Sequence, residues 1–594
     1  MMIPLALQQP LVISIILLLI ALLFLEVLKP SYLFFSVSIV FILTGIIGTE
    51  DLLDALANES ILSIFLLIFI TAGLREHFNI VGFLDKLFGK TTKPKSFMLR
   101  MTAGVTALSS VLNNTPIVAL LMPYVYQWSK KHRVSPSKLL IPLSYAAILG
   151  GMITVIGTST NLVLNGLIES KNATPLGFGH YLIPGLLVSF VGIVFLYFVG
   201  YRLLPSRVDA FKNVEKQARE YWVEMKVLPG SSIVGKSITE AQLRNLESVY
   251  LFEIMRGNQL ITPVEPDEVI QSGDVLFFAG ETENIVDLLN RENGLTAATA
   301  PNGRVGDANH NLVEAVIPVN SELVGNTLKG LEFRENYDAA VVAIHRNGER
   351  LRGKIGEIVM QAGDLLLLST GSHFEQHAKS KPILYLVSEV SKMKNAKPQA
   401  KIGFVTLVIL MIIAASLGVI SLFLALILIT SYMVGTKLLS VSAIKKELDV
   451  DLLIVLVASL TMSKAIIDSG TADLVAHHFV QLFSNFGNIG VLVGLYLVTV
   501  LLTTFVTNVA AVSIVFPVAF AIGQGIPNLD IAAVFLVISF GASACFHVPF
   551  SYQTNLMVYG LGGYKFKDYV KVGGPLTLLY SITALVFIIL YYNV

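Results

Sequence analysis

Long apolar stretches dominate both ends of the chain. The first runs from Leu11 to Leu28 and contains only two polar residues, Ser14 and Glu26. As a helix it is long enough to cross the ~30 Å hydrocarbon core of a bilayer. Because no basic segment precedes it and no small-residue cleavage site follows it, we expect an uncleaved span. Further spans or buried segments are predicted at about 32–48, 60–76, 98–124, 138–157 and 181–204, and again at about 402–418, 420–436, 452–466, 487–520, 530–549 and 572–592.

The middle of the chain has a different pattern. Residues 205–400 are rich in charge, glycine turns and short alternating stretches, and they contain no long apolar run. The pattern predicts a polytopic α-helical membrane protein interrupted by a soluble insert. The predicted units are a first membrane repeat at 1–204, a linker and first insert domain at 205–307, a second insert domain and linker at 308–400, and a second membrane repeat at 401–594.

The composition supports this division. Of the 594 residues, 54% are hydrophobic and only 14% are charged, whereas a soluble protein carries about 25% charged residues. The 42 basic and 41 acidic residues nearly cancel, so the charge balance gives no indication of a nucleic-acid partner. Cys545 is the single cysteine, which excludes an intramolecular disulfide and a cysteine-based zinc or iron–sulfur site.

The two membrane parts align with each other when the chain is shifted by 394 residues. Asn114 then falls on Asn508, Pro123 on Pro517, and the pair 160–161 on the pair 554–555, both reading Thr-Asn. Chance similarity between two apolar segments is the alternative, but a constant offset without a gap over more than forty residues argues against it. We therefore predict an internal repeat.

The charges of the loops indicate that the two repeats are inverted. Residues 85–100 and 129–139 hold nine Lys and Arg residues, whereas the equivalent 479–494 and 523–533 hold none. Because basic loops stay cytoplasmic, equivalent loops are expected on opposite sides of the membrane. Inverted repeats favour a transporter with a binding site near the membrane midplane between the halves, rather than an enzyme.

Polar motifs interrupt the apolar stretches at equivalent places. Ser109, Ser110 and residues 113–116 (Asn-Asn-Thr-Pro) interrupt the first repeat, and residues 503–508 the second. We expect re-entrant hairpins with tips at 109–115 and at the end of 487–507, each followed by a new helix that Pro116 can start in the first repeat. Residues 157–161 and 551–555 are expected to be unwound breaks in a later helix of each repeat.

Such breaks suit ion binding. Irregular backbone at membrane depth is tolerated only where it is buried or lines a cavity. Its free carbonyls, together with Ser, Thr and Asn oxygens, suit a monovalent cation, and the restarted helices direct their positive ends at an anion. The alternative is that these polar residues only pack helices together. Four motifs paired by one offset favour a binding site.

The hairpin tips and Thr-Asn breaks resemble those of the divalent anion:sodium symporters, a family of the ion-transporter superfamily. The resemblance covers essentially the whole chain and is strongest over 550–560, Phe-Ser-Tyr-Gln-Thr-Asn-Leu-Met-Val-Tyr-Gly. Family members of this kind carry a Ser-Asn-Thr triplet at each hairpin tip, whereas the triplets here read Asn113-Asn114-Thr115 and Thr507-Asn508-Val509.

The resemblance implies two sodium sites and one substrate site. The implied ligands of the first sodium are Ser109, Asn113, Asn114 and Gly157. Those of the second are Thr503, Val506 (through its backbone carbonyl), Asn508 and Ser551. The implied substrate contacts are Asn114, Thr115, Thr158, Asn508 and Gln553, with Asn113, Thr507, Thr160, Asn161, Thr554 and Asn555 as further candidates. No enzymatic cofactor is expected, only sodium as the coupling ion.

The departure at Val509 bears on the substrate. It removes a hydroxyl that dicarboxylate carriers use for a carboxylate, which favours a compact anion, and we therefore expect sulfate import by symport. A sodium- or proton-coupled di- or tricarboxylate carrier, or an arsenite-type carrier, remains the alternative within the superfamily. A ligand-gated channel is the alternative from another class, although the sequence contains no Thr-Val-Gly-Tyr-Gly filter. The resemblance also implies an elevator-type motion, a homodimer and the bacterial inner membrane.

The insert contains its own repeat, with an offset of 90 residues. Gly235 falls on Gly325, Arg256 on Arg346, and the turn at 273–274 on that at 363–364, both Gly-Asp. We predict two small α+β domains, at about 216–300 and 308–385, each with a glycine turn, a short helix and hairpins. They resemble the C-terminal domains of potassium-transport regulatory subunits (TrkA-C), which implies dimerisation and a small regulatory ligand. The basic residues on both sides of the insert predict that it is cytoplasmic.

A P-loop pattern in the insert is a further candidate. Residues 230–237 read Gly-Ser-Ser-Ile-Val-Gly-Lys-Ser, which could hold phosphates through Lys236 and magnesium through Ser237. The equivalent 320–327 keeps Gly325 but lacks the lysine. We therefore interpret Gly235 as a turn glycine.

Overall fold

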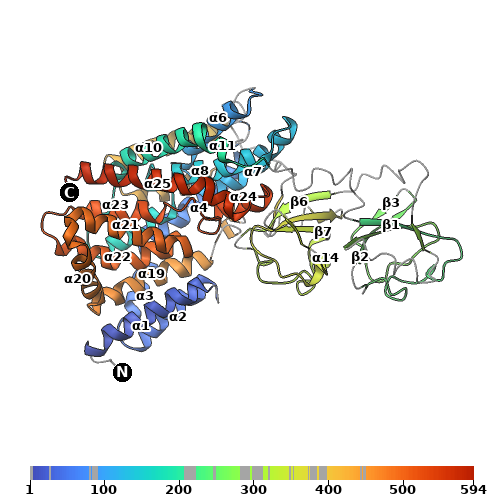
Figure 1. The fold of residues 1–594 in the computed structure, drawn as a ribbon, viewed down its shortest axis with the longest axis horizontal. Coiled ribbons are helices and arrows are strands. Elements are labelled where there is room, and N and C mark those ends of the chain that lie inside the picture. Colours follow the sequence, from blue (N-terminus) through green and yellow to red (C-terminus); the bar gives the residue numbers. More distant parts are fainter. Residues whose placement is uncertain are drawn as a thin grey trace.

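The computed structural model describes most of the membrane part and the two sheets of the insert. The described residues are 5–25, 28–78, 91–206, 222–244, 249–257, 259–280, 295–297, 312–318, 321–346, 349–351, 353–371, 384–386, 398–441 and 450–594, with a few isolated positions between them. Lys86, Lys90 and most of the two linkers lie outside the described residues, and so do the predictions that rest on them. Helices form one body, and the two sheets form a second body at one end of it (Figure 1).

The membrane part is built from helices on both sides of the insert. Before the insert lie α1 (Leu5–Phe24), α2 (Pro30–Leu43), α3 (Thr49–Leu56), α4 (Glu59–His77), α6 (Pro94–Ser109), α7 (Asn114–Lys131), α8 (Leu140–Gly151), α9 (Ser159–Glu169), α10 (Phe178–Phe195) and α11 (Tyr201–Leu203). After it lie α16 (Pro398–Ser416), α17 (Leu422–Gly435), α19 (Val450–Asp468), α20 (Thr471–Phe483), α21 (Gly487–Phe505), α22 (Asn508–Gly525), α23 (Ile531–Ala542), α24 (Gln553–Leu561) and α25 (Phe566–Tyr591). Within the described part, seven helical segments are long and apolar enough to cross a membrane.

The helices correspond in pairs at the offset found in the sequence. Shifted by 394 residues, α7 coincides with α22 at both ends, and the first residue of α9 falls on the first residue of α24. The hairpins α6–α7 and α21–α22 and the broken helices α8–α9 and α23–α24 are therefore equivalent. This confirms the predicted polytopic fold with a hairpin and a broken helix in each repeat.

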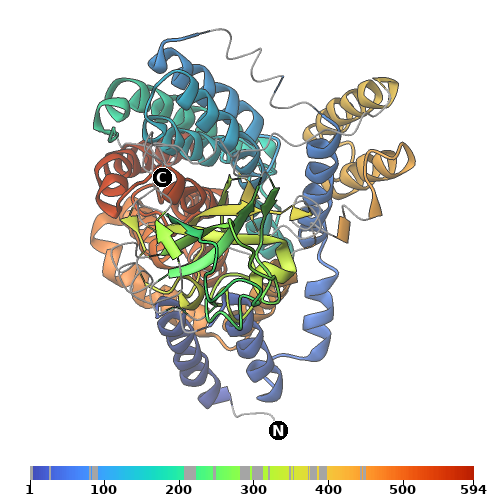
Figure 2. The same ribbon diagram turned by 90° about the vertical axis from the view of Figure 1, so that its right-hand side faces the viewer.

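The hairpins and broken helices form the interior of the membrane part. Helix α6 packs on α8 and α21 packs on α23, while α10 and α25 cover them. One apolar cluster extends through all of these helices. Helices α10 and α25 keep an apolar outer face that includes Phe190 and Leu590, with exposed fractions of 68% and 71%, as expected for side chains that contact lipid. Figure 2 shows α16 and α17 beside the main body, where α17 packs against α4.

The insert consists of two five-stranded antiparallel sheets. The first holds β1 (Trp222–Val227), β2 (Val249–Arg256), β3 (Gln259–Ile261), β4 (Val275–Gly280) and β5 (Leu295–Ala297), in the order β3-β2-β4-β1-β5. The second holds β6 (Leu312–Val316), β7 (Ala339–Arg346), β8 (Glu349–Arg350), β9 (Leu365–Thr370) and β10 (Tyr385–Leu386), in the order β10-β6-β9-β7-β8. Each strand of the second sheet begins 90 residues after its equivalent in the first. The internal repeat of the insert is thus seen strand by strand.

Arginine–aspartate pairs brace the equivalent turns of the two sheets. Arg256 donates to both carboxylate oxygens of Asp274, at 3.0 and 2.9 Å. Arg346 donates to both oxygens of Asp364, at 2.7 Å each. Both carboxylates are buried, so these bidentate pairs fix the turns that precede β4 and β9. Within the described residues of the insert, the short helix expected after the glycine turn is present in the second copy, as α14 (Phe333–Tyr337).

The P-loop candidate has no phosphate cradle. Gly235 has a φ of +81° and donates to Ile270 O at 2.9 Å, while Ser237 pairs with Val269 in an isolated bridge. The hydroxyl of Ser237 accepts from the backbone nitrogen of Glu240. Backbone and side chain at these positions therefore serve a structural turn, as the sequence comparison indicated.

Candidate functional site

The first hairpin brings a polar tip into the interior of the membrane part. Helix α6 ends at Ser109 and α7 begins at Asn114, with Asn113 in extended conformation at the N-cap. Pro116 occupies the first turn of α7, where a missing backbone donor costs nothing because those donors have no partner within the helix. Ser109 and Asn114 are both buried. The hairpin therefore ends one helix and starts the next at its polar residues.

Oxygen atoms converge around Asn114. Ser109 Oγ donates to Ala147 O at 2.8 Å. One of the two terminal atoms of the Asn114 amide faces these groups. It lies 2.7 Å from Ser109 Oγ, 2.9 Å from Ala147 O and 3.2 Å from Gly157 O. If this atom is the nitrogen, it donates to both carbonyls. If it is the oxygen, four oxygens face one another, an arrangement that a bound cation stabilises.

Gly157 is required for this close packing. A Cβ atom at this position would lie 2.9 Å from Ser109 O and 2.7 Å from Gly151 O. Both distances are too short for a side chain, so only glycine lets the break approach the hairpin tip. Three of the four residues expected to bind the first sodium, Ser109, Asn114 and Gly157, thus lie together. Asn113 adjoins them through the chain.

The second hairpin repeats the arrangement. Thr503 Oγ1 donates to Asn508 Oδ1 at 2.9 Å and lies 2.8 Å from Ala542 O. Val506 is buried and extended between α21 and α22. Ser551, the remaining expected ligand, donates to Cys545 O at 3.2 Å, within its own break. The structure thus brings Thr503 and Asn508 together with a carbonyl of the broken helix, as in the first repeat.

The substrate candidates join the two repeats. Thr115 Oγ1 donates to Gln553 Oε1 at 3.2 Å, between the start of α7 and the start of α24. Thr158 occupies the N-cap of α9, and its side chain makes no capping hydrogen bond. Gln553 is exposed and Thr115 half-buried, whereas Thr158 is buried. The N-termini of two half-helices therefore meet here: α7, which restarts after the tip of the first hairpin, and α24, which restarts after the break in the second repeat.

Asn161 and Asn555 hold the two repeats together. Ser539 Oγ donates to Asn161 Oδ1 at 2.8 Å, and Ser144 Oγ donates to Asn555 Oδ1 at 2.7 Å. Each amide nitrogen donates back to a carbonyl of its own break, Asn161 to Thr154 O at 3.1 Å and Asn555 to Val548 O at 3.3 Å. Because both asparagines are fully buried, their amides serve as cross-repeat braces.

The other candidates have different surroundings. Thr507 is exposed and caps α22 by accepting from the backbone nitrogen of Ala510. Thr160 and Thr554 are buried on the first turns of α9 and α24. Thr554 Oγ1 and the nearby Ser543 Oγ have no hydrogen-bond partner among the described residues. Buried hydroxyls usually have a partner, so the second break contains polar groups available to a ligand.

Several contributors to this region were not predicted from sequence. The carbonyls of Ala147 and Ala542 lie in apolar helices and carry no side-chain signal. The imidazole of His547 lies 3.5 Å from Thr504 Oγ1 and 3.3 Å from Thr577 Oγ1. Across the described residues, no three His, Cys, Asp or Glu side chains form a cluster that could hold a metal ion. Around the hairpin tips, the groups that face one another are neutral polar groups and helix N-termini.

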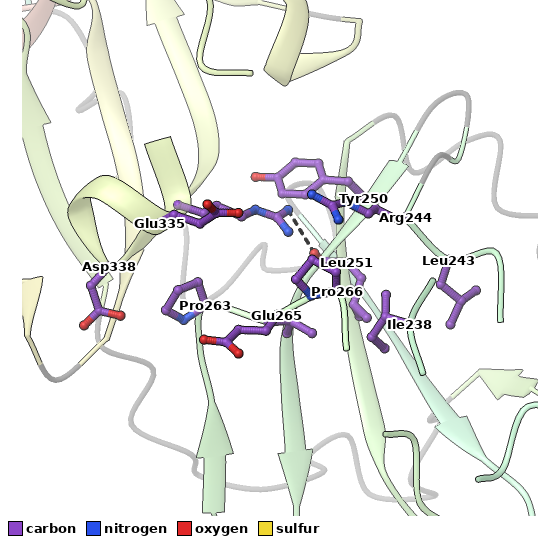
Figure 3. A pocket seen from close by; sticks show the side chains of 12 residues that line it. Ile238, Leu243, Arg244, Tyr250, Leu251, Pro263, Glu265, Pro266, Glu335 and Asp338 are labelled. Carbon is purple, nitrogen blue, oxygen red and sulfur yellow. Dashed lines mark hydrogen bonds between the residues drawn. The ribbon is translucent and has the colours of Figure 1, made fainter. Parts of the chain in front are cut away.

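A second candidate site lies between the two insert domains. A cavity of about 140 Å³ is lined by Ile238, Leu243, Arg244, Tyr250, Leu251, Pro263, Val264, Glu265 and Pro266 of the first domain and by Arg334, Glu335 and Asp338 of the second. Figure 3 shows these side chains converging from both domains. Arg334 donates to Leu251 O at 3.0 Å, and its guanidinium carbon lies 5.0 Å from the centre of the Tyr250 ring.

The two arginines of this cavity occupy equivalent positions of the two domains. Arg244 falls on Arg334 at the offset of 90. Burial lowers the pKa of the Arg334 guanidinium, the Tyr250 hydroxyl opposes this, and Arg244 lowers it further. No ion pair with a described carboxylate neutralises either arginine. This differs from Arg256 and Arg346, which are bonded to aspartates.

Comparison with known proteins identifies the class. A family model described as citrate transporter matches residues 5–430 and 407–594. The chain therefore belongs to this family of membrane transporters, as the hairpins and breaks indicated, and it is an integral membrane protein.

Individual relatives extend over most of the chain. A Chlamydomonas reinhardtii protein, provisionally named a sulfur deprivation response regulator, is 32% identical over 94% of this chain and 97% of its own length. Sodium/sulfate cotransporter 2 of the same organism is 23% identical over 89% of this chain and 83% of its own length. Sodium/sulfate cotransporter 1 is 32% identical over 54% of this chain and 38% of its own length.

Proposed function

We propose that this protein is a sodium-coupled symporter that imports a divalent oxyanion, with sulfate as its main substrate. One observation carries the proposal: at each of the two hairpin tips, a hydroxyl, an asparagine amide and a carbonyl of the broken helix lie together in equivalent positions. Ser109, Asn114 and Ala147 O form one cluster, and Thr503, Asn508 and Ala542 O form the other. Neutral oxygens in a dry interior suit a monovalent cation, and two such clusters give two sodium sites.

The anion is proposed to bind between these clusters. The N-termini of α7 and α24 meet at Thr115 and Gln553, and their backbone donors and dipoles favour negative charge. Thr158 and Asn508 complete the proposed contacts. Cations bound on both sides would lower the cost of holding a dianion without Lys or Arg, so that anion and sodium bind together. The names of the sodium/sulfate cotransporters support this choice of substrate and ion.

A di- or tricarboxylate is the second candidate substrate, because the matching family model is described as citrate transporter. Val509 favours the compact anion: it occupies the second tip, at the position equivalent to Thr115, and offers no hydroxyl. Uptake by purified protein in liposomes separates the candidates. We expect sodium-dependent uptake of radiolabelled sulfate that unlabelled citrate or succinate inhibits weakly.

The wider arrangement is part of the same proposal. The units are 1–204, 205–307, 308–400 and 401–594, with the insert on the cytoplasmic side of a bacterial inner membrane. The hairpins and breaks would move with the bound anion as an elevator, against a scaffold that forms a homodimer. The positive charges of Lys93, at the N-cap of α6, and of Lys95 and Arg100, in its first two turns, support a cytoplasmic position for that end of the hairpin.

The insert is proposed to be a regulatory unit of TrkA-C type. The cavity between its two domains would bind a small anionic ligand. Arg244 and Arg334 support this because two like charges meet there beside the Tyr250 ring, whereas Glu265, Glu335 and Asp338 limit the charge the cavity can accept. Of these acids, Asp338 already accepts from the backbone nitrogen of His373 at 2.7 Å.

A further inference from the structure

The two half-helices that meet at the substrate site extend to the same insert domain at their other ends. Helix α7 runs from Asn114 to Lys131 and α24 from Gln553 to Leu561, and the two pack against each other. At one end Thr115 and Gln553 are hydrogen-bonded. At the opposite end, both helices contact the second insert domain, which Figure 1 shows beside α7 and α24.

The contact with α24 is made directly between backbones. A Cβ atom on Gly560 would collide with the carbonyl oxygen of Gly363, and one on Gly363 would lie 3.0 Å from Leu556 O. Gly363 belongs to the turn before β9 and has a φ of +85°. The two surfaces therefore fit so closely that a side chain at either glycine would displace the segment that packs against it.

The contact with α7 is an ion pair. Lys130, in the last turn of α7, lies 3.3 Å from the carboxylate of Glu314 on β6. The side chain of Glu314 is only 15% exposed, and that of Lys130 is 41% exposed. One insert domain thus bridges a half-helix of the first repeat and a half-helix of the second.

The turn that touches α24 is braced by hydrogen bonds, and its equivalent in the first domain has no membrane helix against it among the described residues. Asp364 follows Gly363 and is held by Arg346 and by the backbone nitrogen of Gln361. The first domain has the same braced turn at Gly273, but a Cβ atom there would meet nothing within 4 Å. Two nearly identical turns thus differ in whether a membrane helix lies against them, so the docking is specific to the second copy.

We propose that Gly560, Gly363, Lys130 and Glu314 are positioning residues, through which the second insert domain sets the spacing of Thr115 and Gln553 at the substrate site. The inference rests on the proposed function, because those two residues are assigned there to anion binding. A domain that spans the far ends of both half-helices restrains their relative tilt, and tilt changes the distance between their N-termini.

The test compares kinetics of sulfate uptake in proteoliposomes for Gly560→Ala and Gly574→Ala. Both add one methyl group to a helical glycine, but a Cβ atom at Gly574 meets nothing within 4 Å. We expect Gly560→Ala to raise the KM for sulfate about fivefold or more, the lower end of ordinary coupling between distant sites, with kcat changed less than KM. Gly574→Ala should match the wild type.

Charge exchange provides the independent check. Lys130→Glu and Glu314→Lys should each raise the KM, and the double variant should restore it, because the ion pair is reformed with its charges exchanged. A purely structural role would alter the yield of folded protein and leave the KM of the folded fraction unchanged. No uptake by the wild type would contradict the proposed function. Wild-type uptake with an unchanged KM in Gly560→Ala, or no rescue in the double variant, would contradict the positioning role alone.

Discussion

Thr115 and Gln553 lie 438 residues apart in the chain, yet their side chains are joined by a hydrogen bond of 3.2 Å. Each is at the start of a half-helix, one in each repeat. The bond places two helix N-termini side by side without a charged side chain between them. An anion that binds there would exchange this bond for contacts of its own.

Removing these side chains should weaken anion binding. Thr115→Val keeps the shape and removes the hydroxyl, and Gln553→Leu removes the amide. We expect each to raise the KM for sulfate by about tenfold, the equivalent of one lost hydrogen bond to a charged group at about 1.5 kcal/mol. Initial rates of uptake over a range of sulfate concentrations measure this. Equal KM values in wild type and both variants would show that the anion binds elsewhere.

The asparagines at the two tips should be essential. Asn114→Ala and Asn508→Ala each remove the group around which oxygens converge, and we expect each to abolish sodium-dependent uptake while the protein still reaches the membrane. Asn165→Ala is a matched control, since Asn165 is also buried in a half-helix and, within the described part of the chain, its amide bonds to Leu176 of its own repeat alone. Wild-type rates in either tip variant would contradict the proposed sodium sites.

A hydroxyl at the second tip should shift the selectivity. Val509→Thr restores the residue type that dicarboxylate carriers use, and it changes the volume of this buried side chain little. We expect succinate to compete more strongly with labelled sulfate in this variant than in the wild type. Val512→Thr makes the same change one helical turn later and should leave competition unchanged. An identical inhibition constant for succinate in Val509→Thr would show that this position does not select the anion.

The cross-repeat braces should support stability. Ser144→Ala leaves the buried amide oxygen of Asn555 without its donor, and Ser539→Ala does the same to Asn161. A buried acceptor without a partner costs about 1–3 kcal/mol of stability. Both variants should therefore unfold at a lower temperature in detergent. Ser14→Ala loses only a bond to Pro10 O on an exposed helix face and should unfold like the wild type.

Ligand binding by the insert can be separated from transport. With Asn114→Ala and Asn508→Ala combined, the proposed transport site is removed, and inorganic phosphate serves as the probe. We expect phosphate to raise the unfolding temperature of this protein, and the added change Arg244→Gln or Arg334→Gln to reduce the effect. The same stabilisation with and without the arginines would contradict an anion site in the cavity.

Much of this architecture follows from the sequence because repetition is visible there. The offset of 394 residues places α7 on α22, and the offset of 90 places every strand of one sheet on its equivalent in the other. A few polar residues and glycines are enough to reveal both offsets. Proline and asparagine at the tips indicated where helices restart, since they satisfy or avoid the free backbone donors of a helix start.

Other parts of the site left no trace in the residue types. The carbonyls of Ala147 and Ala542 belong to apolar helices, and any residue supplies such an oxygen. The braces of Ser144 and Ser539 look like ordinary small residues of membrane helices until their partners are known. The docking of Gly363, and not of the equivalent Gly273, depends on which copy of the insert faces α24. That is a tertiary relationship, and both copies have the same local pattern.

Uptake of radiolabelled sulfate by purified protein in liposomes, with and without an inward sodium gradient, tests the central claim most directly. We expect accumulation that requires the gradient and disappears when potassium replaces sodium. Sulfate uptake that is equal in both salts, or sodium-driven uptake of citrate or succinate without any uptake of sulfate, would contradict the assignment of a sodium-coupled sulfate symporter.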